Sequence, residues 1–375
     1  MTTIINNENK KLNVPNLRFP EFQGEWEKCK LEDVMNFSTT RINSSELNEG
    51  NYVSTENMLQ DYQGIMEAKS VPEDVNVISY SCGDILISNI RPYLKKVWKA
   101  TFNGGCSSDV FVLKANDNIE SDYLHYVIAN DKFINFVMSG AKGVKMPRGD
   151  KKQMKTYSLS LPQIQEQKKI GKMLSLLDER IATQHKIIDK LQSLIKGIRV
   201  RLVQIEKGNI VHLNEIASIY QPQTISSTEL TEDGFLVYGA NGIIGKYKDY
   251  NHKTEQICIT CRGNTCGMVN YTKPMSWITG NAMVINTDEH LNVVCKRYLF
   301  HYLSAYNFNR IISGSGQPQI VRTPLEKLEI TLPSILEQEQ KAMLLDRIQA
   351  KIENCNRVLS LYQEQKQYLL RQMFI

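Results

Sequence analysis

The motif most similar to a phosphate-binding loop covers residues 239–247, where the sequence reads Gly-Ala-Asn-Gly-Ile-Ile-Gly-Lys-Tyr. A phosphate-binding loop needs the pattern G-x4-G-K-[ST], whose final hydroxyl binds magnesium. Here the spacing misses by one residue, and Tyr247 stands in place of the hydroxyl residue. We therefore expect a glycine-rich turn between two strands, and no nucleotide site.

Four possible zinc donors lie in the second half of the chain, namely Cys258, Cys261, Cys266 and His252. They include one C-x-x-C pair but no second pair, and the alternation around Cys258 is typical of a buried strand. The six histidines form no H-E-x-x-H group. The motifs Asn-Pro-Pro-Tyr and Asp-Pro-Pro-Tyr, with which DNA amino-methylating enzymes hold a flipped base, do not occur either. We expect no metal site and no catalytic residue, which disfavours a self-sufficient nuclease or methyltransferase.

Cations are concentrated in one short stretch of the first half, with only Asp150 against them. Gly143 and Gly149 leave the backbone of this stretch free to follow a row of DNA phosphates. A solvated surface loop would explain the same charges equally well, so both interpretations stay open. The stretch contains Lys142, Lys145, Arg148, Lys151, Lys152 and Lys155.

An arginine ends each of two strand-like stretches that match each other 171 positions apart, Arg91 after 85–90 and Arg262 after 256–261. Arginine in this place can read guanine in the major groove, and an intradomain ion pair is the alternative. In the second half, Gln317 and Gln319 offer amides suited to adenine. The candidate DNA-binding residues are Arg91, Lys95, Lys96, Lys142, Lys145, Arg148, Lys151, Lys246, Arg262, Gln317, Gln319 and Arg322.

These residues must be positioned by elements that the chain contains twice. Apolar residues recur at alternating steps of four and three from Ile170 to Leu202, and again from Leu345 to Met373, which predicts two long helices with coiled-coil seams. Both helices begin with Leu-Pro-x-x-x-Glu-Gln, at 161–167 and at 332–338. The seam residues are Leu177, Ile181, Ile188, Leu191, Ile195, Ile198, Ile348, Ile352, Leu359, Tyr362 and Leu369.

Each seam contains one polar position, Gln184 in the first helix and Lys366 in the second. A polar seam residue can set the register of a coiled coil. Alternatively, these residues lie where the seam frays or where a partner subunit covers it.

The repeat divides the chain into five segments. We expect a mobile tail over 1–16, a mixed α/β domain over 17–160, a long helix over 161–207, a second mixed domain over 208–332 and a last long helix over 333–375. The fold class is α+β, with an internal repeat. Between the matched landmarks the two mixed domains differ in their side chains.

Composition agrees with a globular protein, at 42% hydrophobic and 23% charged residues. No apolar run of about 18 residues and no signal-peptide pattern occur, so we expect a cytoplasmic protein without a membrane contact. The cysteines are expected to be reduced and buried, as at Cys82, Cys106, Cys258 and Cys355. The net charge of +5 permits nucleic acid as a partner without requiring it.

Taken together, the chain resembles the specificity subunit of type I restriction-modification enzymes. The two helix starts at 161–167 and 332–338 carry most of this resemblance, each with a long heptad helix behind a variable domain. The strand 84–91 and the turn 238–245 also resemble target-recognition domains of this family.

The resemblance implies two target-recognition domains, each reading half of a bipartite sequence in double-stranded DNA, and an antiparallel coiled coil with pseudo-two-fold symmetry between them. It also implies two methyltransferase subunits and motor-nuclease subunits as partners. This chain would then be a non-catalytic guide that binds no cofactor itself, in a complex that uses S-adenosylmethionine, ATP and magnesium. The main rival is a coiled-coil adaptor that holds proteins together without reading DNA.

Overall fold

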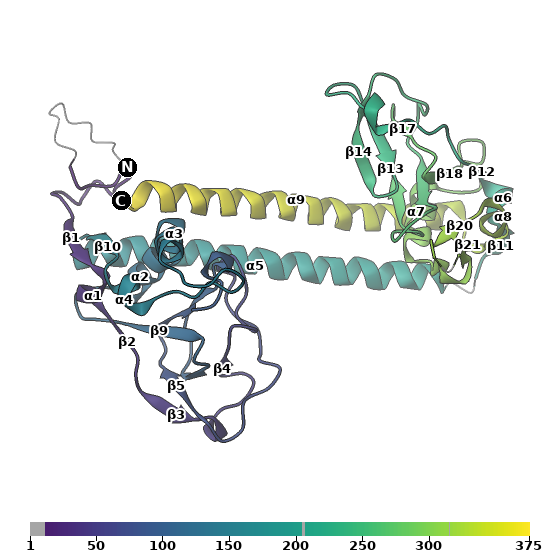
Figure 1. The fold of residues 1–375 in the computed structure, drawn as a ribbon. Helices are drawn as coiled ribbons and strands as arrows, with labels where there is room; N and C mark the ends of the chain where they lie inside the picture. The colour runs from purple at the N-terminus through teal and green to yellow at the C-terminus, as the bar shows by residue number, and fades with distance from the viewer. Residues whose placement is uncertain (1–11, 205–206, 315) are drawn as a thin grey trace. The chain divides into compact units, whose positions relative to one another are not determined.

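Two long helices, α5 (Ile164–Val203) and α9 (Ile335–Met373), each contribute residues to two structural units (Figure 1). The computed structural model describes residues 12–204, 207–314 and 316–375. The first unit comprises Met1–Thr183 with Leu359–Ile375, and the second comprises Gln184–Val358. In the described part of the chain, no helix combines the length and the hydrophobicity needed to cross a membrane.

The first unit is built on a four-stranded antiparallel sheet, flanked by a second sheet of four strands. The first sheet has the order β2 (Met35–Phe37), β9 (Val110–Ala115), β6 (Ile85–Ser88) and β7 (Val97–Lys99). The second has the order β3 (Arg41–Asn43), β5 (Asn76–Tyr80), β8 (Gly104–Cys106) and β4 (Tyr52–Val53). A separate pair joins the start of the domain to its end, β1 (Glu27–Lys30) and β10 (Ser158–Leu161).

The second unit repeats the main sheet and the closing strand pair of the first, which confirms the duplication predicted from the sequence. Its main sheet has the order β12 (Ser218–Tyr220), β18 (Ala282–Asn286), β15 (Ile257–Thr260) and β16 (Val269–Tyr271). Its second sheet has the order β14 (Gly242–Tyr247), β13 (Phe235–Gly239) and β17 (Trp277–Ile278). The closing pair is β11 (Asn209–His212) with β21 (Glu329–Leu332), and a short hairpin joins β19 (Ile312–Ser313) to β20 (Gln319–Ile320). The glycine-rich motif at 239–247 is the turn of the β13–β14 hairpin, as expected.

The central strand of each main sheet is buried on both faces because its side chains alternate between two hydrophobic clusters. In β6, Ile85 and Ile87 face one cluster and Leu86 faces the other. In β15, Ile257 and Ile259 play the same part, and Cys258 faces the second cluster. This two-sided burial explains why both strands read as continuous apolar runs.

Two side chains cap shorter helices of the first unit. Residues 121–139 form two helices, because the Asn130 side chain accepts a hydrogen bond from the backbone of Lys132 and caps a new helix. The basic loop expected to reach Lys155 ends at Asp150, which caps a short helix in the same way. The helices and turns are α1 (Leu31–Val34), α2 (Ser121–Ile128), α3 (Asp131–Ser139), α4 (Lys151–Lys155), α6 (Leu213–Ile216), α7 (Lys296–Ala305), α8 (Arg322–Glu326), η1 (Ser44–Glu46), η2 (Pro92–Leu94), η3 (Ser227–Glu229) and η4 (Phe308–Arg310).

A glutamine explains why the same motif begins both long helices. In the first unit, Gln167 Nε2 donates to the Pro162 carbonyl at 2.8 Å, and its Oε1 accepts from the Glu120 backbone at 2.8 Å. In the second unit, Gln338 makes the equivalent bonds to Pro333 at 2.9 Å and from Cys295 at 2.9 Å. Each buried glutamine therefore ties the start of a long helix to the residue before α2 or α7.

The seams pack within each unit, and their order shows that the helices run antiparallel. The beginning of α5 clusters with the end of α9 in the first unit, and the end of α5 clusters with the beginning of α9 in the second. Gln184 Nε2 donates to the Cys355 carbonyl at 3.1 Å, and Lys366 Nζ lies 2.6 Å from Asp178. Both polar seam positions therefore have partners inside the seam, which favours a role in setting register. The predicted seam residues are all buried or half-buried.

Two smaller expectations differ from the structure. Of the tail expected to be mobile, residues 1–11 lie outside the described part, but Asn13 is buried and its Nδ2 donates to the Trp26 carbonyl at 2.6 Å. Ordered packing thus begins before residue 17. Cys82, expected to be buried, is exposed because it lies beyond the end of β5.

Candidate nucleic-acid interface

In the first unit, the chain leaves the buried strand β6 and exposes Arg91 on its surface. Arg91 has a left-handed backbone (φ 50°) and precedes Pro92 of η2. Its amide donates to the Pro147 carbonyl at 2.8 Å, and the Gly149 amide donates to the Asn89 carbonyl at 3.0 Å. The basic loop is therefore hydrogen-bonded to the end of the core strand, and the structure brings Arg91 and the loop together.

The loop itself is a small hairpin, which we call hairpin A (residues 142–148). Lys142 and Arg148 exchange backbone hydrogen bonds of 3.0 and 2.9 Å. The backbone of Arg148 also forms an isolated antiparallel β-bridge with Ile90. Gly143 has φ +95°, a conformation that side-chain-bearing residues rarely adopt. The Arg148 guanidinium lies 2.9 Å from Asp109 and keeps 54% of its side chain exposed. Hairpin A thus presents cations on a fixed backbone.

The second unit has the same construction with different side chains. Arg262 follows β15 and is exposed. Its backbone forms an isolated antiparallel β-bridge with Gln319. The Gly263 amide donates to the Pro318 carbonyl at 3.0 Å, and Pro318 lies 171 positions after Pro147, which accepts from the Arg91 amide. The donor is shifted by one residue, because Arg91 matches Arg262 in the repeat. We call the described residues 313–314 and 316–319 hairpin B. It brings Arg262 beside Gln317 and Gln319, both exposed.

Three of the predicted cations are used inside the first unit. Lys95 Nζ lies 2.8 Å from Asp131, and Lys96 Nζ donates to the Thr55 carbonyl at 2.6 Å. Lys151 Nζ lies 4.6 Å from the centre of the Phe111 ring. Burial lowers the pKa of Lys96 and of Lys151. Because these contacts already engage the three ammonium groups inside the unit, we remove the three lysines from the candidate interface.

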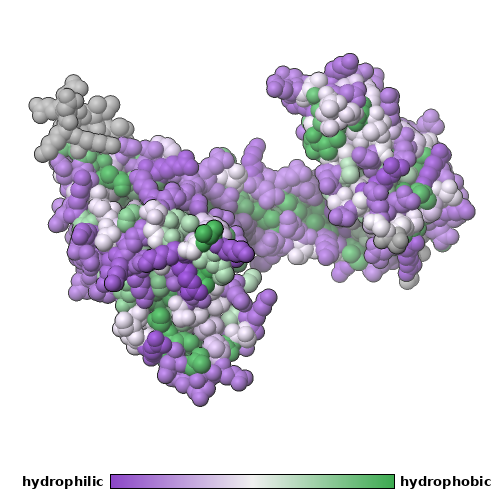
Figure 2. All heavy atoms as spheres, viewed as in Figure 1, coloured by the Kyte–Doolittle hydropathy of each residue, from purple (hydrophilic) through white to green (hydrophobic). Residues whose placement is uncertain are grey.

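Two further predicted cations stand apart from the hairpins. Arg322 begins α8 and lies 2.7 Å from Glu326, one turn along the same helix. Lys246 lies on β14, 3.5 Å from Asp233. Beside it, Ile243 and Ile244 are 54% and 48% exposed, and Figure 2 shows hydrophobic surface where β13 and β14 lie. The interface that remains consists of Arg91 with Lys142, Lys145 and Arg148, and of Arg262 with Gln317 and Gln319.

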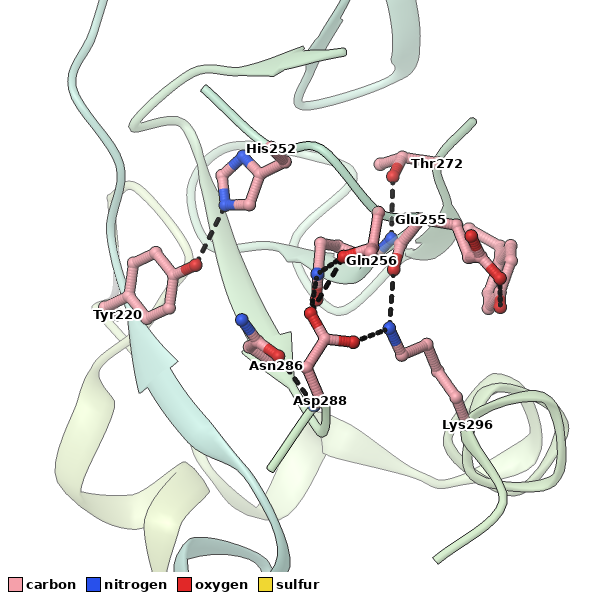
Figure 3. A network of polar contacts seen from close by, with 10 residues as sticks. Tyr220, His252, Glu255, Gln256, Thr272, Asn286, Asp288 and Lys296 are labelled. Carbon is pink, nitrogen blue, oxygen red and sulfur yellow. Dashed lines mark hydrogen bonds and ion pairs between the residues drawn. The ribbon is translucent and has the colours of Figure 1, made fainter. Parts of the chain in front are cut away.

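A polar network fixes the segment that leads into β15 (Figure 3). The Asp288 carboxylate accepts hydrogen bonds from Gln256 Nε2 at 2.9 Å and Thr254 Oγ1 at 2.8 Å, and it pairs with Lys296 at the start of α7. Lys296 Nζ also donates to the Glu255 carbonyl at 2.7 Å. Although burial opposes the change, these hydrogen bonds lower the pKa of Asp288. The network holds the beginning of β15 against α7.

The four residues considered as zinc donors have other surroundings. Cys258 is fully buried in β15, where burial raises its pKa to about 12. Cys261 is buried with its Sγ 3.2 Å from the Asn281 carbonyl, and Cys266 is half-buried. His252 Nε2 lies 2.9 Å from the Tyr220 hydroxyl (Figure 3). Within the described ranges, no group of three or more His, Cys, Asp or Glu side chains is arranged to hold a metal ion.

The sequence pattern did not predict the polar contacts that dock α2 and α7 on the long helices. The Tyr126 hydroxyl of α2 donates to Asp178 at 2.8 Å in the first unit. In the second unit, His301 Nε2 of α7 lies 2.8 Å from Asp346, to which Arg297 also pairs. The sequence indicates these contacts in one way: a polar residue occurs on the face of α2 or α7 that packs against a long helix.

The chain matches the model of a protein family described as type I restriction modification DNA specificity domain, over residues 23–193 and 206–360. It is 32% identical over 146 residues to the type I restriction enzyme EcoprrI specificity subunit of Escherichia coli, a match to 38% of this chain and 36% of that protein. It is 25% identical over 297 residues to the type I restriction enzyme MjaVIII specificity subunit of Methanocaldococcus jannaschii, covering 67% of this chain and 68% of that protein.

The match to the Escherichia coli relative thus spans little more than a third of that protein, and the match to a putative relative in Haemophilus influenzae spans 42%. Among solved structures, the S subunit of a type I restriction-modification system from M. genitalium has a TM-score of 0.72 at 15% identity. That match covers 96% of this chain and 99% of the other. It shows a shared fold.

Proposed function

The chain belongs to the type I restriction modification DNA specificity domain family, and we propose from this premise that it reads DNA sequence for a type I restriction-modification complex. One observation carries the proposal. Each unit sets an exposed arginine at the end of its central strand beside a hairpin on the same backbone frame, and the side chains of hairpins A and B differ. Repeated geometry with changed side chains suits two readers of two different half-sites.

Hairpin A suits positioning on phosphates, because Lys142 and Lys145 are exposed cations and such contacts carry little sequence information. Hairpin B suits base reading, because the exposed amides of Gln317 and Gln319 can pair bidentately with adenine. Arg91 and Arg262 each suit guanine. The target would then be bipartite and asymmetric, unlike the palindrome read by a symmetric dimer.

We further propose that the chain is a non-catalytic guide for two methyltransferase subunits and for motor-nuclease subunits. The support is the duplication itself, since the starts of α5 and α9 are held by equivalent glutamine hydrogen bonds and so offer two similar places for two copies of one partner. S-adenosylmethionine, ATP and magnesium would be used by those partners and not held by this chain.

The test compares methylation with and without the chain. Methylome sequencing of cells that lack the chain should show the loss of one bipartite adenine-methylation motif, and its return on complementation. In vitro, the purified chain should transfer no methyl group alone and should direct methylation when its methyltransferase is added. Methyl transfer by the chain alone contradicts the guide function. A complex that assembles but shows no motif identifies a coiled-coil adaptor instead.

A further inference from the structure

The tip of hairpin A holds two apolar side chains out in solvent. Val144 is 100% exposed and Met146 is 47% exposed. The two backbone hydrogen bonds between Lys142 and Arg148 close the hairpin below them, and the left-handed Gly143 allows the tight tip. A fully exposed aliphatic side chain gains nothing from the fold of its own chain, so its apolar surface is free to contact a ligand.

The surroundings of this tip identify the kind of ligand. Lys142 is 82% exposed, Lys145 is exposed, and Arg91 is held beside the hairpin through Pro147. The nearby acids, Asp109 and Asp150, are already paired with Arg148 and Lys142. An apolar tip framed by cations is complementary to an apolar group that lies between phosphates.

Hairpin B offers a comparison within the same chain. Its residues 314–318 read Gly-Ser-Gly-Gln-Pro and include no aliphatic side chain. Gln317 stands 171 positions after Met146, at the equivalent place. The same hairpin position therefore carries a thioether in the first unit and an amide in the second, so what the two hairpins can recognise differs in kind.

We propose that Val144 and Met146 recognise thymine through its C5 methyl group in the major groove of one half-site. The inference rests on the proposed DNA-reading function. The major groove admits a two-stranded ribbon, and the thymine methyl is the apolar feature that it displays. Two cations would hold the tip in the groove. Arg91 would read guanine, and Lys145 would pair with a phosphate.

The experiment removes the methyl group without changing base pairing. Binding of the chain in complex with its methyltransferase is measured on DNA that carries its own methylation motif, with each thymine of the motif replaced singly by deoxyuridine. At one thymine or more, the replacement should weaken binding roughly four-fold, the equivalent of one methyl group buried. In the wild-type complex, the sensitive thymines should all lie in one half-site. In the Val144→Ala, Met146→Ala double variant this sensitivity should disappear.

Met66→Ala is the matched control, because Met66 is a 54% exposed methionine of the same unit outside hairpin A. It should keep the wild-type response to deoxyuridine. Indifference of the wild-type complex to every replacement, or a motif without thymine in that half-site, overturns the inference while the DNA-reading function stands. If the double variant no longer binds the methyltransferase, while deoxyuridine still weakens its binding to DNA, the tip contacts the protein partner. That result also overturns the inference. A complex that does not prefer its motif at all overturns the proposed function itself.

Discussion

The two units dock their helices α2 and α7 through contacts with the same plan but different chemistry. In the first unit, Tyr126 donates to Asp178 of α5, and Lys366 of α9 pairs with the same carboxylate. In the second unit, the roles of the long helices are exchanged: the carboxylate is Asp346 of α9, and it meets His301 and Arg297 of α7. Arg199 of α5 completes the second contact.

The difference teaches that both units dock a short helix on a carboxylate of a long helix, although the carboxylates do not match in the repeat: Asp178 and Asp346 lie 168 positions apart instead of 171. Arg199 Nε donates to His301 Nδ1 at 3.1 Å, so Nδ1 must be an acceptor and the ring proton must lie on Nε2, facing Asp346. Burial lowers the pKa of His301 to about 4, against the opposing hydrogen bond to Asp346. The second docking contact therefore contains a neutral histidine, whereas the first is made by the Tyr126 hydroxyl and the Lys366 ammonium group.

The starts of the long helices give a second comparison. Glu166 is buried and accepts two hydrogen bonds of 2.8 Å from Arg18. Its counterpart Glu337 is exposed and accepts from the backbone of Ser334 at 3.2 Å. The glutamines that follow them make the same bonds in both units. Within the repeated motif, the glutamine therefore has the same role in both units, whereas the role of the glutamate depends on the residues around it.

The largest effect is expected from breaking the buried pair at the first helix start. Arg18→Ala leaves the Glu166 carboxylate buried without a partner, which should reduce the free energy of unfolding by about 3–5 kcal/mol. Urea denaturation of the whole chain measures this loss. Glu337→Ala is the matched variant and should cost about 1 kcal/mol or less, because it removes an exposed cap. Equal losses in the two variants would show that the helix starts are energetically alike.

The docking contacts should differ in their response to acid. Because the folded-state pKa of His301 lies below its unfolded value near 6.5, the folded state binds fewer protons, and its contribution is lost as the pH falls from 6.5 through 4. His301→Gln should therefore reduce the loss of unfolding free energy between pH 7 and 4.5 by about 2.5 kcal/mol relative to wild type.

Two histidine variants control this measurement. His125 in α2 is half-buried, and desolvation lowers its pKa to about 3, so His125→Gln should reduce the acid sensitivity as well, independently of His301. His185→Gln changes an exposed residue of α5 and should leave the acid sensitivity as it is. If the His301 variant keeps the full acid sensitivity, the proton uptake lies elsewhere.

The hairpins should differ in what they contribute to DNA binding. Arg262→Ala should relax discrimination at one position of one half-site, by roughly 1–3 kcal/mol if the arginine reads a base edge. The methylation motif of the variant complex measures this directly. A folded Arg262→Ala variant with an unchanged motif would mean that the arginine does not read a base.

The smallest effect is expected from hairpin A. Lys145→Ala should weaken binding to all sequences about equally and reduce the slope of log affinity against log salt by about one. Binding titrations at several salt concentrations, on motif and non-motif DNA, measure both quantities. Gln317→Ala in hairpin B serves as the contrast, because it removes no charge and should leave the salt slope unchanged. A sequence-specific loss for Lys145→Ala would mean that Lys145 contacts a base and not a phosphate.

The sequence by itself determined the duplication, the two long helices and the central strands. These features have a strict period, and a period follows from local geometry alone: seam residues recur every three or four positions, and β6 and β15 read as apolar runs because both faces are covered. The matched arginines after these strands could be found for the same reason, since the 171-residue offset carries Arg91 onto Arg262.

Only the tertiary structure decided which cations are available and which polar residues are buried. Lys95, Lys96 and Lys151 resemble Lys142 and Lys145 in sequence, but Asp131, Thr55 and Phe111 reach them from distant parts of the first unit. In the same way, Glu166 and Glu337 share a motif, and only the approach of Arg18 from 148 positions away buries one of them. Contacts between residues far apart in the chain leave no periodic trace, so their partners, and with them the pKa of His301 and the exposure of Val144, become visible only when the chain is folded.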